Sequence, residues 1–176
     1  MKKIILFLIV LAIVPISMFA QAQAEAPANP MLEVDLGPAA FYKSPVLMGQ
    51  PIDIRNANCD QFAFGADLRV KFGVFQAEAL TLYSAGATNS LNTYLDVGLA
   101  IDIAIVRLSL GVGPNFIFNL ENSTPFQAGF NAKAGIDLNV GPVVFGVSYI
   151  MALNIANVTT INTSSGLLGA EVLFKL

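Results

Sequence analysis

The stretch that decides the fold is "GLLGAEVLFKL", residues 166–176, the last eleven of the printed sequence. One parity is apolar: Leu168, Ala170, Val172, Phe174 and Leu176. The other parity carries Gly169, Glu171 and Lys175, and only Leu173 breaks its polar character. Alternation at period two indicates a β-strand with one apolar and one polar face. Most soluble chains end in a polar, frayed tail, so this strand needs an explanation.

The other end of the sequence indicates export. Residues 1–24, "MKKIILFLIVLAIVPISMFAQAQA", begin with two lysines, continue with an apolar run and end in small residues around Ala20, Ala22 and Ala24. This is the three-part build of a secretory signal peptide. The apolar run is short for a membrane-spanning helix, which needs roughly 20 residues. We therefore expect a signal peptide over residues 1–24 and one domain over residues 25–176.

Composition places the domain at a membrane. The chain is 55% hydrophobic and 12% charged, with twelve acidic and nine basic residues and no basic cluster, so we expect no nucleic-acid partner. One cysteine, Cys59, excludes an internal disulfide. So much apolar surface is more than an ordinary small soluble domain carries. Membranes are spanned by helices or by closed barrels.

Period-two alternation recurs along the whole domain and favours the barrel. It predicts strands at about residues 31–42, 61–72, 74–83, 93–103, 106–120, 127–139, 142–154 and 166–176. Thirteen charged residues fall in these strands, and all lie on the polar parity: Glu33, Asp35, Asp67, Arg69, Lys71, Glu78, Asp96, Asp102, Arg107, Lys133, Asp137, Glu171 and Lys175. Charges must stay off a lipid-facing surface, so we expect this parity to face the lumen.

A helical alternative exists near the carboxyl terminus. Residues 138–170 contain no charged residue, and "VGPVVFGVSYIMALNIANV" has the length of a membrane span. The stretch also contains Gly141, Pro142 and Gly146 and many β-branched residues, which disfavour a helix. The parity pattern favours strands here too.

Connection lengths alternate strictly between short and long. The second, fourth and sixth strands are followed by tiny turns near residues 73, 104–105 and 140–141. The first, third, fifth and seventh are followed by residues 43–60, 84–92, 121–126 and 155–165. Outer-membrane barrels pair short periplasmic turns with longer outer loops and have an even strand number. We predict an all-β fold, an eight-stranded antiparallel up-and-down transmembrane β-barrel, whose last strand pairs with the first because an open edge cannot sit in lipid.

With this pattern the chain resembles the small eight-stranded bacterial outer-membrane barrels of the OmpX, OmpW and OmpA-barrel type. Their last strand ends in alternating apolar residues with an aromatic near the end; Val172, Phe174 and Leu176 fit, although a final Leu stands where Phe is usual. The resemblance implies that these residues are the signal read by the barrel-assembly machinery. It also implies an outer-membrane location in contact with lipid. The chain has no tryptophan, so an aromatic girdle must use Phe and Tyr, such as Tyr42, Phe72, Phe75, Tyr83, Phe118 and Phe145.

The lumen of such a barrel is filled by side chains or holds one small ligand. The thirteen charged residues, eight acids and five bases, are interpreted as an ion-paired filling, with a narrow polar conduit or a pH-sensitive gate as alternatives. The chain has no histidine, which excludes a Ser-His or Asp-His catalytic device. No acidic cluster has the spacing of a metal site. We therefore expect no enzymatic activity, no cofactor and no metal.

Two features suggest more than a scaffold. The dipeptides Gly37–Pro38 and Gly113–Pro114 lie inside strands, where proline removes a ladder donor. Pro38 and Pro114 are thus candidates for a wall opening, or mark simple bulges. The first long loop contains five apolar residues, Val46, Leu47, Met48, Ile52 and Ile54. They are candidates to cap the mouth, bind an apolar ligand or touch a partner, unless the loop folds on itself. We assign no function to Cys59, which lies in the same loop.

Three functional hypotheses follow. The favoured one is a non-enzymatic outer-membrane barrel that acts as a narrow channel or carrier for small, even hydrophobic, solutes. The second keeps the barrel and makes it a surface-exposed adhesion or envelope-stabilising protein that acts through its outer loops. The third is a soluble, exported, lipocalin-like barrel in which the apolar parity would face inward. Alternating loop lengths and scarce charge favour the membrane.

Overall fold

The computed structural model describes residues 32–43, 59–85, 89–120, 126–153 and 166–176. They belong to one compact unit, Met31–Leu176. The other unit, Met1–Pro30, lies outside the described residues, and so does the expected signal peptide.

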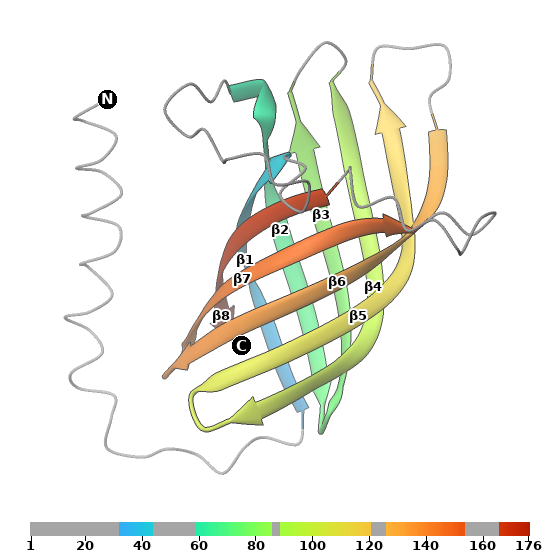
Figure 1. Ribbon diagram of the computed structural model, residues 1–176. Helices are drawn as coiled ribbons and strands as arrows, with labels where there is room; N and C mark the ends of the chain where they lie inside the picture. Colours follow the sequence, from blue (N-terminus) through green and yellow to red (C-terminus); the bar gives the residue numbers. More distant parts are fainter. Residues whose placement is uncertain (1–31, 44–58, 86–88, 121–125, 154–165) are drawn as a thin grey trace, which may run out of the picture. The chain divides into compact units, whose positions relative to one another are not determined.

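Eight strands account for nearly all of the described chain (Figure 1). They are β1 (Leu32–Lys43), β2 (Phe62–Phe72), β3 (Phe75–Ser84), β4 (Ser90–Ile103), β5 (Val106–Asn119), β6 (Phe126–Val140), β7 (Val143–Leu153) and β8 (Gly166–Lys175). A single 3-10 turn, η3 (Cys59–Gln61), precedes β2. Every predicted strand is present, and the largest difference is at β4, which begins at Ser90 rather than Thr93.

The strands form one closed antiparallel ring in chain order. Each strand pairs with the next, and β8 pairs with β1. The last residue joins this seam, because the Leu176 backbone N–H donates to the carbonyl oxygen of Val34 at 2.8 Å. The predicted eight-stranded up-and-down barrel is therefore confirmed. The terminal strand is apolar on one side because it forms part of the closed barrel wall, whose outward face is apolar.

Three two-residue turns join β2 to β3, β4 to β5 and β6 to β7, at one end of the barrel (Figure 1). The first residue of each has a positive φ: 59° at Gly73, 56° at Ala104 and 59° at Gly141. Positive φ at this position suits the hairpin turns whose twist matches the strands. Glycine adopts it without steric cost, whereas Ala104 brings a Cβ into an unfavourable region.

The two faces of the wall differ in chemistry. The outward parity is apolar and exposed, with exposed fractions of 65% for Phe75, 64% for Val97 and 62% for Leu110. Every charged residue of the described strands lies on the inward parity. Leu173, which breaks the alternation of the last strand, faces inward and is fully buried. The soluble lipocalin-like alternative requires the reverse arrangement, which the described strands do not have.

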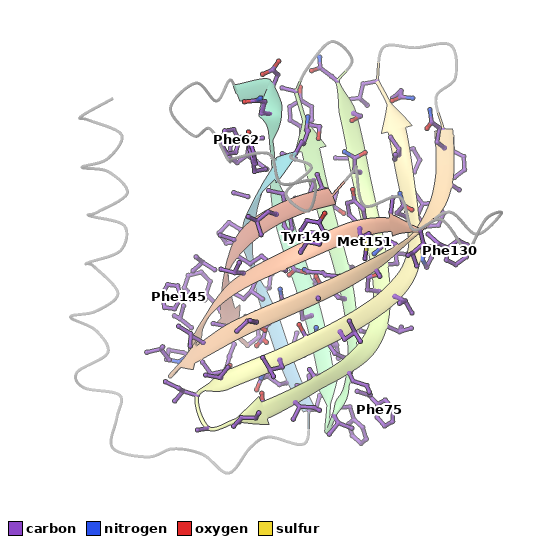
Figure 2. The ribbon with its side chains drawn as sticks, viewed as in Figure 1. Phe62, Phe75, Phe130, Phe145, Tyr149 and Met151 are labelled. Carbon is purple, nitrogen blue, oxygen red and sulfur yellow. The ribbon has the colours of Figure 1, made fainter. Side chains whose placement is uncertain are left out.

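Aromatic side chains on the outward parity gather toward both ends of the wall. Phe72, Phe75, Phe145 and Phe174 lie toward the tight turns. Toward the longer connections, ring centroids lie 5.3 Å apart for Tyr42 and Phe62 and 5.3 Å apart for Phe118 and Phe126. Figure 2 shows Phe62 and Phe75 near opposite ends of the barrel.

Where it is described, the carboxyl-terminal stretch that offered a helical alternative contains the end of β6, a tight turn, β7 and the start of β8, and no helix. Among the described residues, no helix is long and apolar enough to cross a membrane.

Candidate functional site

The lumen holds the thirteen charged side chains singled out in the sequence. Eleven of them are buried, and Asp102 and Lys175 are half-buried. They come from seven strands, all except β7, and reach one another because inward side chains of a narrow barrel meet across its axis. Their ion pairs divide them into two clusters, with Asp96 outside both.

The first cluster, here the Arg107 cluster, lies toward the tight turns and consists of Arg107, Lys71, Lys175, Glu33, Asp35 and Asp102. The Arg107 guanidinium donates to three carboxylates: to Asp102 Oδ1 at 2.7 Å, to Asp35 Oδ2 at 3.1 Å and to Glu33. Lys71 pairs with Asp102, and Lys175 Nζ lies 3.3 Å from Glu33 Oε2. Three bases meet three acids, so the formal charges balance.

The second cluster, the Arg69 cluster, consists of Arg69, Lys133, Asp67, Glu78, Asp137 and Glu171. Arg69 donates to Asp67 Oδ2 at 2.8 Å, to Asp137 Oδ2 at 2.9 Å and to Glu171. Lys133 Nζ donates to Glu171 Oε1 at 2.7 Å and pairs with Glu78. Four acids meet two bases here, so two negative charges have no matching base.

These contacts connect strands that are distant in the chain. Glu171 of β8 accepts hydrogen bonds from Arg69 of β2, Lys133 of β6 and Ser148 of β7. Arg69 and Glu171 are 102 residues apart. Removing one partner of a buried ion pair costs about 3–5 kcal/mol, so the network couples the closing strand to the rest of the ring.

An apolar core inside the lumen was not anticipated from the sequence. It lies on the side of the longer connections and consists of Ala39, Phe41, Ala63, Leu80, Leu82, Tyr94 and Ile150, with Leu167 packed against it. Phe41, Leu80 and Leu82 are fully buried. The Phe41 ring occupies the space where a side chain at position 169 would lie, which explains the glycine there. Lys133 Nζ lies 5.6 Å from the centre of that ring, so the core adjoins the Arg69 cluster.

The signal for this core was present as large apolar residues on the inward parity, such as Phe41, Leu80 and Ile150. Charged residues dominate the inward parity, which is why these apolar positions do not stand out in the sequence.

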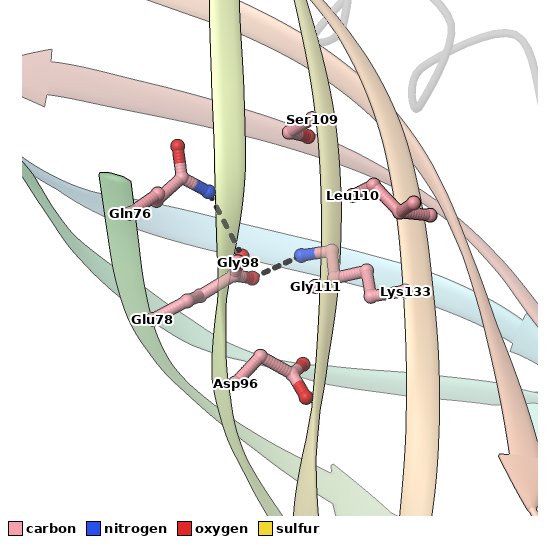
Figure 3. A pocket seen from close by; sticks show the side chains of 8 residues that line it. All are labelled: Gln76, Glu78, Asp96, Gly98, Ser109, Leu110, Gly111 and Lys133. Carbon is pink, nitrogen blue, oxygen red and sulfur yellow. Dashed lines mark hydrogen bonds and ion pairs between the residues drawn. The ribbon is translucent and has the colours of Figure 1, made fainter. Parts of the chain in front are cut away.

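One cavity opens among the charged side chains, with a volume of about 10 Å³. Gln76, Glu78, Asp96 and Lys133 line it together with Ser109, Leu110 and two glycines (Figure 3). Asp96 accepts a hydrogen bond from Asn131 Nδ2 at 2.7 Å and makes no ion pair with a described residue. A cavity of this size holds about one water molecule.

The structure brings together an acidic group that sequence spacing did not reveal. One carboxylate oxygen from each of Asp67, Glu78 and Glu171 lies within 4.8 Å of the others. Arg69 and Lys133 lie among these carboxylates and pair with all three. A metal ion placed between them would have to displace both cations.

Pro38 and Pro114 both face outward and interrupt a ladder on one side. The register between β1 and β8 passes from Leu36↔Phe174 to Ala39↔Glu171 without pairing the two residues between. Between β4 and β5 it passes from Tyr94↔Asn115 to Val97↔Val112 in the same way. The register is unchanged across each gap, so neither is a bulge. A Cβ added at Gly37 or Gly113 would collide with a carbonyl oxygen of the neighbouring strand, so the backbones approach closely there.

The remaining predicted residues fall into two groups. Val172 and Phe174 lie on the outward face of β8, and Leu176 follows directly after this strand. Their role as an assembly signal stays a prediction. The apolar loop residues Val46, Leu47, Met48, Ile52 and Ile54 lie outside the described residues. At the described edge of that loop, Lys43 Nζ donates to the backbone oxygens of Asp60 at 2.9 Å and Ala85 at 3.2 Å.

Comparisons with known proteins bear on the fold. No family model matches this sequence, and no curated protein matches it. Among solved structures, the chain is similar to the N-terminal β-barrel domain of Pseudomonas aeruginosa OprF, with a TM-score of 0.52 and 12% identity over 81% of this chain and 97% of that one. Neisserial surface protein A (NspA) matches with a TM-score of 0.46 and 19% identity, over 82% of this chain and 97% of that one. The likeness to the OprF domain supports the eight-stranded barrel fold.

Proposed function

We propose that this chain is an integral outer-membrane β-barrel protein, exported by its amino-terminal signal peptide. Its lumen is closed to solutes, and it catalyses no reaction. It stabilises the envelope and displays its longer connections at the surface. The observation that carries this proposal is the apolar outward face of the described strands, which carries no charged residue, around a buried, ion-paired lumen.

The outward face has dimensions that suit a bilayer. Outward side chains of β3 run from Phe75 to Tyr83. Eight residue steps at about 3.3 Å each, tilted by about 40°, give an apolar height of roughly 20 Å. This is close to the roughly 25 Å apolar band of outer-membrane barrels, and aromatic side chains flank it at both ends. In water the same face would be a large aggregation-prone surface.

The filled lumen favours a scaffold over a pore. Two charge clusters and an apolar core follow one another along the axis, and the cavity among the charged side chains is the size of one water molecule. A solute moving along the axis would have to displace buried ion pairs and the Phe41 core together.

The test is folding followed by conductance. The mature chain is diluted from urea into buffer with or without detergent micelles, and β-structure and heat-dependent gel mobility are followed. We expect folding in micelles alone and no stepwise current in planar bilayers. Folding to a monomer in plain buffer would refute membrane insertion, whereas steady current steps would refute the closed lumen and leave insertion intact.

A second candidate is a carrier that passes apolar solutes sideways through the wall. The two ladder interruptions at Pro38 and Pro114 favour it, because the strands, which lie close together there, could part without breaking ladder pairs. Binding of a fluorescent fatty acid to the micelle-folded protein is compared among wild type, Pro38→Ala and Pro114→Ala, with Pro142→Ala in a turn as the control. Weaker binding in the first two variants supports the carrier; equal binding in all four proteins contradicts it.

A further inference from the structure

The described lumen contains more acids than bases, and the excess is localised. The Arg107 cluster is balanced, so all three surplus negative charges belong to the Arg69 cluster and Asp96. Every one of these seven side chains is at least nine-tenths buried. Burying a charge without a partner is strongly unfavourable, so this region favours the uptake of positive charge.

The hydrogen bonds of the lumen also show too few donors for the buried acceptors. Among the described residues, the buried inward-facing side-chain atoms without a partner are all oxygen atoms. Three are carboxylate oxygens of the acid-rich region: Asp67 Oδ1, Asp96 Oδ2 and Asp137 Oδ1. Asp35 Oδ1 is a fourth carboxylate oxygen, in the balanced cluster. Unpartnered buried acceptors call for a donor, a water molecule or an ion, and three of these four carboxylate oxygens lie where the acids are in excess.

The cavity gives a ligand access to two of the unpartnered oxygen atoms. Asp96 and Gln76 line it, and each has an oxygen without a partner, Oδ2 and Oε1 respectively. Figure 3 shows Glu78 between Gln76 and Lys133, engaged with both. Asn131 Nδ2 donates a hydrogen bond to the other carboxylate oxygen of Asp96, Oδ1. The groups that face Asp96 are thus Glu78 of β3, and Lys133 and Asn131 of β6, with Lys133 already paired to acids.

We propose that Asp96 and the cavity beside it bind a small cation from solution, which offsets part of the excess negative charge of the Arg69 cluster. The ligand is either a proton or a hard metal ion such as Na⁺ or Ca²⁺. A proton converts an unpartnered carboxylate oxygen into a donor and removes one negative charge. A hard metal ion prefers carboxylate and amide oxygens, the groups that Asp96 and Gln76 present. The proposal does not depend on what surrounds the barrel or on the function proposed above.

The test uses micelle-folded protein at neutral pH, with Asp96→Asn as the variant and Asp102→Asn, in the balanced cluster, as the matched control. Elemental analysis after dialysis against Na⁺ or Ca²⁺ measures bound metal, and the infrared carbonyl band of protonated carboxyl groups measures bound protons. We expect wild type to show one of the two signals. Asp96→Asn should reduce the bound-metal or carboxyl signal by one charge equivalent without lowering the midpoint temperature of unfolding. Asp102→Asn should leave the signal unchanged and lower the midpoint, because Arg107 and Lys71 lose a carboxylate.

A second variant separates the two ligands. A Cβ at Gly111 would lie 3.2 Å from Asp96 Cβ, so Gly111→Ala narrows the cavity without changing charge. It should abolish metal binding and spare the carboxyl band. Absence of both signals in wild type would overturn the proposal, as would an Asp96→Asn signal equal to that of wild type. Equal midpoint losses in Asp96→Asn and Asp102→Asn would also overturn it, because Asp96 would then act as an ionised partner.

Discussion

Replacing Arg69 with methionine tests whether the buried network holds the barrel together. Arg69→Met keeps much of the side-chain volume and removes the guanidinium, which is 2% exposed and donates to Asp67, Asp137 and Glu171. Breaking one buried pair costs about 3–5 kcal/mol. Three carboxylates lose a partner at once, so we expect a loss at the upper end, about 4–5 kcal/mol. Stabilities of 5–15 kcal/mol are typical, so this loss is a large fraction.

The assay is urea unfolding of micelle-folded protein, followed by gel mobility and β-structure. Lys175→Met is the matched control, because its side chain is 27% exposed and pairs with Glu33 at 3.3 Å; a pair of this kind contributes about 0–1 kcal/mol. In a double-mutant cycle, the unfolding free energies of Arg69→Met, Glu171→Gln and the double variant should give a coupling energy of about 1 kcal/mol or more. Losses below about 1 kcal/mol for Arg69→Met, or equal losses for both lysine and arginine variants, would refute a structural role for the network.

Three further outcomes are expected in the same unfolding assay. Ala104→Gly relieves a positive φ and should stabilise by up to about 1 kcal/mol, whereas Gly73→Ala should destabilise by about 1 kcal/mol; a loss in the first would show that Ala104 is unstrained. Leu110→Arg, midway along the outward face, should cost about 2–4 kcal/mol and Leu32→Arg near the turns about 0–1 kcal/mol; equal costs would contradict a lipid-facing wall. Phe41→Ala empties part of the lumen core and should cost about 3–5 kcal/mol; a loss below 1 kcal/mol would show that the core is loosely packed.

Much of the fold could be predicted because charge and strand geometry constrain each other. A strand has two faces, so Asp67, Arg69 and Lys71 had to share one of them, and charged residues marked the inward face of every strand except β7. The short turns at positions 73, 104 and 141 then left antiparallel neighbours as the simplest connection. These are local properties, readable within ten residues, and the structure follows them closely.

The interior could be predicted only in part because its partners are not local. Nothing within a strand says that Arg69 meets Glu171 rather than Glu33, because that choice depends on the tilt and stagger of the whole ring. The core around Phe41 was missed for a related reason. An inward apolar residue next to inward charges reads as an exception, as Leu173 did, until the lumen is seen to change character along its axis.

The two ladder interruptions have a mechanical consequence. They lie between β8 and β1 and between β4 and β5, so they divide the ring into two shells of four strands that meet along opposite edges. One of these edges also holds both ends of the barrel chain and has the shortest ladder among the described residues. A stretching force applied to the two ends therefore loads that edge alone, one hydrogen bond after another. The barrel should therefore open first between β1 and β8, while the longer β4–β5 ladder still holds the two shells together.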